Sequence, residues 1–315
     1  METRALRYFQ TVAEFGSYSR GAEFLRISQP AVSRQIGKLE EELGQPLFRR
    51  HGHGVSLTEA GRVLLERSQA VLRQLEQAKA EIRGGRAGPS GTLSLALPPA
   101  AGHYLAPALV ERFAGRFPNV FLRLVGGFSG YIHEWLVRGQ VDLACLHDPL
   151  PQRGFEITPL VNEQVHLVGR PRAEGGSGAV LNGRDHARIA DLADLPLVLP
   201  SRPNASRRLL DAWIAQRGLE LDVRAEVDDH SIIRALVKQG VGYTLLTRGA
   251  IESELRHGEL RAWPFRPRAH WRLALVASTS APRSEIVEAL IATIRDVARE
   301  LSASGAWPAQ SLDRS

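Results

Sequence analysis

The 315-residue sequence has a single cysteine, Cys145, so we expect neither an internal disulfide nor a cysteine-rich zinc site. It has no uninterrupted apolar run of about 18 residues, the length that a membrane-spanning helix needs. Its first residues, METRALRYFQ, lack the apolar stretch and small-residue cleavage site of a secretory signal. These absences predict a protein of the reducing cytoplasm with no membrane partner.

Motifs that would mark a common enzyme class are missing as well. The sequence has no GxxxxGKS/T phosphate loop, no GxSxG nucleophile elbow and no HExxH metal helix. His51 and His53 flank a glycine but lack a third metal ligand, so we expect no metal and no cofactor. One sequence does not exclude a catalytic triad assembled from distant residues. An enzyme on a doubly wound α/β fold, with an accessory N-terminal helical domain, therefore stays as the alternative function.

Acidic residues do not balance the basic ones near the N-terminus. The chain carries a net charge of +6, and residues 1–90 contribute +4 of it. A local basic excess attracts polyanions such as nucleic acids. However, 37 of the 40 basic residues are arginine, which could equally reflect codon bias. Charge alone therefore leaves nucleic-acid binding open.

The composition, 43% hydrophobic and 23% charged, is that of a folded protein, and the length suits two or three domains. The local patterns divide the chain into five parts. Residues 1–57 form a helical domain that ends in a hairpin, 58–83 one long amphipathic helix, and 84–91 a hinge with the sequence GGRAGPSG. Residues 92–305 form a domain of alternating strands and helices, and 306–315 a loop-like tail.

From residue 92 onward, short apolar runs alternate with helical patterns, which predicts a largely parallel sheet covered by helices. The strands are expected at 92–97, 120–126, 141–146, 165–169, 195–200, 241–246 and 271–278. The helices are expected at 102–116, 129–138, 204–217, 230–239, 249–257 and 283–302. The glycine-rich stretch 175–186 is expected to form a loop.

The segment SYSRGAEFLRISQPAVSRQIGKLEEELG predicts two helices joined by a short turn. Ser17 or Ser19 suits the N-cap of the first helix, and Ser28 suits the N-cap of the second. Pro30 fits the first turn of the second helix, where a proline costs no internal hydrogen bond. The apolar residues of this second helix fall on one stripe and should be buried. They are Val32, Ile36, Leu39 and Leu43.

The opposite face of that helix is rich in hydrogen-bond donors. Glutamine and arginine can each make two hydrogen bonds to a purine edge in the major groove, and serine and lysine suit phosphates. A short turn before such a helix is typical of a helix-turn-helix in which the second helix reads the DNA. The alternative is a solvated face on an ordinary helical hairpin. The residues of this face are Gln29, Pro30, Ser33, Arg34, Gly37 and Lys38.

The sequence PLFRRHGHGVSLT predicts a two-stranded wing after the second helix. Its strands would be Leu47–Phe48 and Val55–Leu57, with the basic residues Arg49 and Arg50 between them. A basic wing can enter a neighbouring minor groove of DNA.

Residues 58–83 predict one long helix with Thr58 as its N-cap. Small and apolar residues recur at alternating spacings of three and four, which is a heptad seam. At about 1.5 Å per residue the helix would be about 39 Å long, and a dimer with a second copy would cover its seam. The alternative is packing onto the chain's own domains. The seam residues are Gly61, Leu64, Ser68, Val71, Leu75, Ala78 and Ile82. A dimer would bind an interrupted inverted repeat in DNA.

The run SQPAVSRQIGKLEEELGQPLFRR, followed by VSLTEAG, resembles the winged helix-turn-helix signature of LysR-type transcriptional regulators. The resemblance covers about the first 85 residues without a gap, with Gly21 and Ser19 where the family commonly has alanine and threonine. It implies a sequence-specific regulator of promoter DNA, without enzymatic activity, that assembles as a dimer or tetramer and can contact RNA polymerase. The DNA-contacting residues would be Ser28, Gln29, Pro30, Ser33, Arg34, Lys38, Arg49 and Arg50.

The resemblance also implies an α + α/β fold in which the C-terminal domain is a two-lobed effector domain of the periplasmic-binding-protein type. Lobe one would comprise 92–161 and 268–305, and lobe two 162–267. Within the family, LPSRPNASRR and GFSGYIHEWLVRGQVDLACL are most similar to members such as the nitrogen assimilation control protein. That similarity leaves open whether an effector is required.

Ligands of open α/β sheets bind where strands end and helices begin. Four such segments are rich in serine, proline and asparagine, and they predict a site for a small polar or carboxylate effector with Arg202 as counter-charge. At each position the alternative is a plain helix cap. Phe128, Tyr243 and Trp263 could line an apolar pocket or belong to the core. The expected effector residues are Pro98, Pro99, Ala100, Phe128, Ser129, Gly130, Ser201, Arg202, Asn204 and Ser231.

Overall fold

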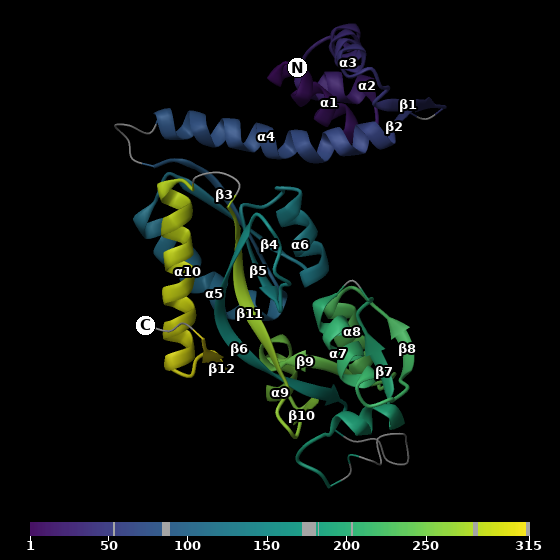
Figure 1. Cartoon of the computed structure of the whole chain (residues 1–315), viewed down its shortest axis with the longest axis vertical. Coiled ribbons are helices and arrows are strands. Elements are labelled where there is room, and N and C mark those ends of the chain that lie inside the picture. Colours follow the sequence, from purple (N-terminus) through teal and green to yellow (C-terminus); the bar gives the residue numbers. More distant parts are fainter. Residues whose placement is uncertain are drawn as a thin grey trace. The chain divides into compact units, whose positions relative to one another are not determined.

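The computed structural model (Figure 1) describes residues 1–52, 54–83, 89–171, 181, 183–202, 204–279 and 283–312. The chain forms two compact units. The first comprises residues 1–91 with 137–140, and the second comprises 92–136 with 141–315. Most of the predicted hinge, His53, most of the glycine-rich stretch 175–186 and the side chain of Ile82 lie outside the described residues.

The first unit has the predicted order of three helices, a hairpin and a long helix. Its elements are α1 (Thr3–Phe15), α2 (Tyr18–Leu25), α3 (Gln29–Leu43), β1 (Phe48–His51), β2 (Gly54–Leu57) and α4 (Glu59–Arg83). Ser17 caps α2 by accepting a hydrogen bond from the Arg20 amide, and Thr58 accepts one from the Gly61 amide at the start of α4. Ser28 occupies the predicted N-cap position of α3, although its side chain makes no capping hydrogen bond there.

A single apolar core holds α1, α2, α3 and the hairpin together. Phe9 and Val12 of α1 pack with Val32 and Ile36 of α3, and all four side chains are fully buried. Leu39 continues this stripe, whereas Leu43 is 41% exposed. The predicted stripe is therefore one turn too long, because α3 extends beyond the core at its C-terminal end.

The first half of α4 packs on its own unit. A Cβ at Gly61 would overlap the Leu47 carbonyl oxygen, so only glycine allows this close approach. Ser68 is 2% exposed and accepts a hydrogen bond from the Gln10 amide, and Leu64 packs against the apolar core. The alternative of packing onto the chain's own domain thus describes this half, and it removes Leu64 from a free seam. Farther along, Val71 is 51% exposed.

The main sheet of the second unit has the strand order β10-β6-β11-β5-β3-β4, with β9 and β12 also paired to β6, and β7 (Pro196–Leu199) and β8 (Asp222–Glu226) form a separate two-stranded sheet. The strands are β3 (Gly91–Leu97), β4 (Val120–Gly126), β5 (Leu143–His147), β6 (Phe155–Gly169), β9 (Thr244–Thr247), β10 (Arg261–Pro264), β11 (His270–Ser278) and β12 (Ala309–Ser311). The sheet is mixed and not largely parallel, because β6 and β11 run antiparallel to each other while β3 and β5 are parallel.

Strand β6 is much longer than the predicted 165–169. Nine of its first ten residues pair with β11, with Leu160 left out at a register shift, and Val165 to Val168 pair with β9 instead. The change of partner falls between Gln164 and Val165. Strand β8 (Asp222–Glu226), which pairs with β7 (Pro196–Leu199), was also missing from the predicted elements, as was β10.

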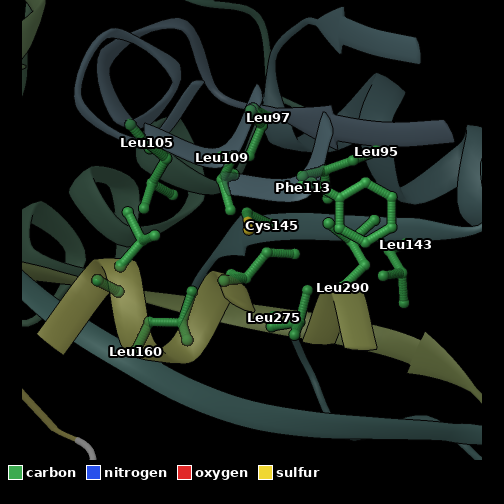
Figure 2. Close-up of a cluster of buried hydrophobic side chains, with 14 of the residues drawn as sticks. Leu95, Leu97, Leu105, Leu109, Phe113, Leu143, Cys145, Leu160, Leu275 and Leu290 are labelled. Atoms are coloured by element: carbon green, nitrogen blue, oxygen red, sulfur yellow. The ribbon is translucent and has the colours of Figure 1, made fainter. Parts of the chain in front are cut away.

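Helices pack on both parts of the second unit, the part in which β6 pairs with β11 and the part in which it pairs with β9. They are α5 (Pro99–Arg116), α6 (Ser129–Val137), η3 (Ile189–Asp194), α7 (Ala205–Ala215), α8 (His230–Lys238), η4 (Arg248–Ala250), α9 (Glu252–Arg256) and α10 (Glu285–Ala303). Figure 2 shows the core in which α5 and α10 face β3, β5 and β11, with Leu109, Cys145 and Leu275 among its side chains. Burial raises the pKa of the Cys145 thiol to about 12, so this cysteine is an inert core residue.

A second core lies around β7, β9 and β10. Tyr243 and Trp263 are buried in it, with their ring centroids 6.1 Å apart. Of the two interpretations offered for these aromatic residues, membership of the core is the correct one.

The predicted loop-like tail is ordered over Trp307 to Ser311. Trp307 is 1% exposed in the core between α5 and α10, stacks on Tyr104 with ring centroids 5.5 Å apart, and donates a hydrogen bond from Nε1 to Glu163. Strand β12 then pairs with β6. Sequence reasoning missed this because a short tail with one tryptophan has no periodicity, although a tryptophan is seldom left in water.

Candidate DNA-binding surface and effector cleft

Helix α3 presents its donor-rich face to solvent. Ser28, Gln29, Pro30, Arg34 and Lys38 are exposed, and Ser33 is half-exposed. The buried stripe on the other side of the helix fixes this orientation. Within the described chain, Arg34 and Lys38 make no ion pair, so their charges are available to an external anion.

The wing is attached directly to α3. The Glu40 carboxylate of α3 accepts hydrogen bonds from the Leu47 amide at 2.7 Å and the Phe48 amide at 3.2 Å. Arg49 and Arg50 are exposed, and the Arg50 guanidinium lies 5.6 Å from the ring centroid of Tyr18. These contacts place the basic wing beside the exposed face of α3.

Sequence reasoning missed one basic residue in the turn between α2 and α3. Arg26 is exposed and has a φ of 55°, the left-handed conformation that ends α2. It makes no ion pair within the described residues. A basic residue immediately before the reading helix was the available signal for a further phosphate contact.

In the second unit, the N-termini of four helices converge on one pocket. Helices α5, α6, α7 and α8 each follow a strand, as the strand-end argument predicts, and each contributes residues to a narrow pocket whose enclosed volume is about 30 Å³. Half of the ten predicted effector residues line it. These are Pro98, Ala100, Phe128, Ser129 and Asn204.

The other five predicted residues do not line the pocket, and the cap interpretation describes only Ser231 among them. The Ser201 hydroxyl donates to Asp228 at 2.6 Å, and Ser231 makes hydrogen bonds to Asp229, the N-cap of α8. Pro99 is exposed on the first turn of α5, and Gly130 lies beyond the lining residues of α6.

Arg202 is also directed away from the pocket. Its side chain is 78% exposed and lies 3.4 Å from Asp211. Among the described residues, no arginine or lysine lines the pocket. The predicted counter-charge for a carboxylate effector is therefore wrong.

Two histidines that sequence reasoning missed line the pocket. His147 Nε2 lies 2.7 Å from the buried Glu163 carboxylate, which also accepts the Trp307 hydrogen bond. His230 stacks on Phe128 with ring centroids 4.2 Å apart. Burial, together with the neighbouring His147, lowers the pKa of His230 to about 4, so His230 is neutral at pH 7.

Five buried polar atoms of the pocket residues have no hydrogen-bond partner within the described chain. Leaving such an atom unsatisfied costs about 1–3 kcal/mol, so a cluster of five is unusual in a core. A ligand or water with matching donors and acceptors would satisfy them. The atoms are Asn204 Nδ2, His230 Nδ1, Thr244 Oγ1, Thr247 Oγ1 and Trp271 Nε1.

Two further searches cover the described residues only. No cluster of three or more histidine, cysteine, aspartate or glutamate side chains is arranged to hold a metal ion there. No helix there has both the length and the apolar character needed to cross a membrane.

Comparison with known proteins identifies both units. Residues 3–62 match the family "Bacterial regulatory helix-turn-helix protein, lysR family", and residues 86–299 match the "LysR substrate binding domain". The chain is 33% identical to the transcriptional regulator BbuR of Bordetella bronchiseptica, over 98% of this chain and 93% of BbuR. It is 29% identical to the nitrogen assimilation regulatory protein nac of Escherichia coli, over 93% of this chain and 95% of nac, in agreement with the predicted resemblance.

Solved structures share the fold along the whole chain. A full-length OxyR variant from Pseudomonas aeruginosa has a TM-score of 0.69 at 23% identity, covering 100% of this chain and 99% of OxyR. Full-length CbnR in complex with its target DNA also has a TM-score of 0.69, at 22% identity, covering 94% of this chain and 100% of CbnR. The α + α/β fold, the two family matches and the named relatives lead to one conclusion. This chain belongs to the LysR family and is a DNA-binding transcriptional regulator with an effector-binding domain, not an enzyme.

Proposed function

We propose that this regulator acts in the cytoplasm, binds promoter DNA as a dimer or a dimer of dimers, and is controlled by a small molecule in the cleft of its second unit. In this proposal residues 1–57 bind DNA, 58–83 pair two copies, 84–91 form the hinge, 92–305 bind the effector and 306–315 form the terminal segment. Contact with RNA polymerase at the promoter belongs to the same proposal.

The exposed face of α3 is the observation that carries the DNA-binding part. Arg34 and Lys38 are exposed without ion pairs within the described chain, and Gln29 lies on the first turn of the same helix. An arginine with a free guanidinium can read guanine through two hydrogen bonds, while the wing arginines bind phosphates. We therefore assign base reading to Gln29 and Arg34, and phosphate contacts to Ser28, Ser33, Lys38, Arg49, Arg50 and Arg26.

Fluorescence anisotropy with the DNA upstream of the gene for this regulator tests this assignment. Arg34→Ala should weaken binding to the specific site by about 10- to 100-fold, with a much smaller effect on unrelated DNA. Arg224→Ala is the matched control, because Arg224 is equally charged and exposed but lies in β8. Equal affinities of Arg34→Ala and the wild type for the specific site would refute the assignment.

Dimerisation is assigned to the part of α4 beyond its contact with the first unit. Val71 and Ala78 are exposed and Leu75 is half-buried, so their apolar surface is available to a second copy. Ile82 keeps its predicted place in the heptad seam. Leu75→Asp should shift the sedimentation coefficient to that of a monomer and reduce operator affinity. Operator binding at wild-type affinity by a monomeric variant would contradict the proposed dimer.

The effector is proposed to be a small polar molecule that binds chiefly through neutral hydrogen bonds. The five unsatisfied atoms of the cleft offer two fixed donors, on Asn204 and Trp271, and two hydroxyl groups, on Thr244 and Thr247. With no arginine or lysine among the described lining residues, an uncharged ligand is favoured over a carboxylate.

This ligand class can be tested with matched probes. Differential scanning fluorimetry would compare primary amides with the carboxylic acids of the same carbon skeleton. Binding of an amide should raise the melting temperature in the wild type and not in Asn204→Ala, since the side-chain amide of Asn204 would contact the ligand. Selective stabilisation by the acids would overturn the preference for an uncharged ligand.

A further inference from the structure

A second groove lies in the second unit, and it shares no lining residue with the effector cleft. It is formed by β6, β10, α9 and the loop before β11. Its volume is about 590 Å³, and it is open to solvent. Its floor is apolar, with Leu255, Leu260 and Phe265 among its lining residues. The groove is therefore large enough for an organic molecule.

Four arginines line this groove, and no aspartate or glutamate does among the described residues. They come from three places in the chain. Arg248 follows β9, Arg261 begins β10, and Arg266 and Arg268 lie in the loop before β11. All four are exposed, and Arg261 also lies over the ring of Trp263, 5.0 Å from its centroid.

Only one of these four arginines, Arg266, forms an ion pair with a carboxylate of the described residues. Arg248 and Arg268 make no hydrogen bond or ion pair with the described residues. Arg261 donates only to the carbonyl oxygen of Arg184, and Arg266 lies 3.5 Å from Asp185. The groove thus gathers like charges whose mutual repulsion an anion would relieve.

The remaining titratable group of the groove adds no negative charge. His166 is half-buried beside Arg248, and burial together with that arginine lowers its pKa, which keeps it neutral at pH 7. Guanidinium groups bind carboxylates and phosphates through paired hydrogen bonds, so several around one groove suit an anion with more than one charge.

We propose that this groove binds a small organic anion with at least two negative charges, a phosphate ester or a polycarboxylate. The arginines hold the charged groups, and the apolar floor contacts the carbon skeleton. The two sites would then bind different classes of ligand, because the effector cleft offers neutral hydrogen bonds and the groove offers positive charge.

Isothermal titration calorimetry on the full-length chain, at fixed ionic strength in chloride buffer, tests the proposal with phenyl phosphate and citrate. Phenol and acetate are the matched probes with no charge and one charge. Wild-type protein should bind phenyl phosphate, citrate or both, and should bind phenol and acetate much more weakly. Binding of only one of the two polyanions identifies whether the groove prefers phosphate or carboxylate.

The double variant R248Q/R268Q should bind that polyanion at least about tenfold more weakly than the wild type. The control R217Q/R224Q loses the same charge from exposed sites outside the groove and should bind as the wild type does. Circular dichroism would verify that both variants are folded. The proposal is overturned if neither polyanion binds, if both double variants lose affinity equally, or if a polyglutamate peptide binds where the small anions do not.

Discussion

Thr244→Val should stabilise the protein in the absence of a ligand. Thr244 is fully buried at the start of β9, and its hydroxyl has no hydrogen-bond partner within the described chain. An unsatisfied buried hydroxyl costs about 1–3 kcal/mol, and valine replaces it with a methyl group of nearly the same shape. Valine also suits a strand at least as well as threonine. We expect the free energy of unfolding to rise by about 1 kcal/mol.

Thr293→Val is the control, because this threonine does make a hydrogen bond. Its hydroxyl donates to the Ala289 carbonyl oxygen at 2.7 Å within α10. Removing that bond should lower the free energy of unfolding by about 0.5–1.5 kcal/mol. Urea denaturation of wild type and both variants would measure the two changes, which are expected to have opposite signs.

Thr244→Val should also weaken effector binding in the cleft, since it removes a hydroxyl group that the effector would contact. A gain in stability together with a loss of effector response would separate a binding role from a structural one. If Thr244→Val destabilises the chain as much as Thr293→Val does, the Thr244 hydroxyl is satisfied in the free protein. The reasoning from unsatisfied atoms would then be refuted.

Three further changes test other parts of the structure. Gly61→Ala should destabilise the first unit by about 1–3 kcal/mol in urea denaturation, because the new Cβ would overlap the Leu47 carbonyl oxygen. An unchanged midpoint would contradict that close contact. Trp307→Phe keeps an aromatic side chain but is smaller and removes the hydrogen bond to Glu163, and we expect a loss of about 1–3 kcal/mol by the same assay, whereas a neutral effect would mean that the tail does not dock. His230 has a pKa of about 4 in the folded protein, against 6.5 for an ordinary histidine, so the unfolded chain takes up the proton first as the pH falls. The free energy of unfolding should therefore be highest above pH 6.5 and decrease as the pH falls towards 4. His230→Gln should flatten this part of the stability profile, and identical profiles would refute the assignment.

The sequence was sufficient to predict the DNA-binding half. The i, i+4, i+7 stripe of Val32, Ile36 and Leu39 sets which face of α3 is buried, so the exposed face follows by elimination. The dimer seam was predicted less well, because the heptad pattern does not distinguish a second copy from the chain's own core. Leu64 and Ser68 follow the pattern yet pack on their own unit.

The effector cleft was only half predictable, for a topological reason. Pro98, Phe128 and Asn204 lie where strands end and helices begin, and this rule can be read from sequence. Ser206 and His230 lie in the first turns of α7 and α8, whereas the other polar residues, His147, Thr244, Thr247 and Trp271, come from within or at the ends of β5, β9 and β11. Their side chains meet only because β6 exchanges β11 for β9 along its length, and no local pattern indicates that exchange. The direction of the Arg202 side chain is likewise set by its partner Asp211, nine residues away in the sequence.

The central claim is that the exposed face of α3 directs this regulator to specific promoters. Genome-wide mapping of bound DNA in the host, for the wild type and Arg34→Ala at the same expression level, tests it most directly. We predict that the wild type occupies a small set of sites sharing an interrupted inverted repeat, and that Arg34→Ala loses them while retaining weak general binding to DNA. Diffuse or absent binding by the wild type, or an unchanged site set in the variant, would contradict the claim.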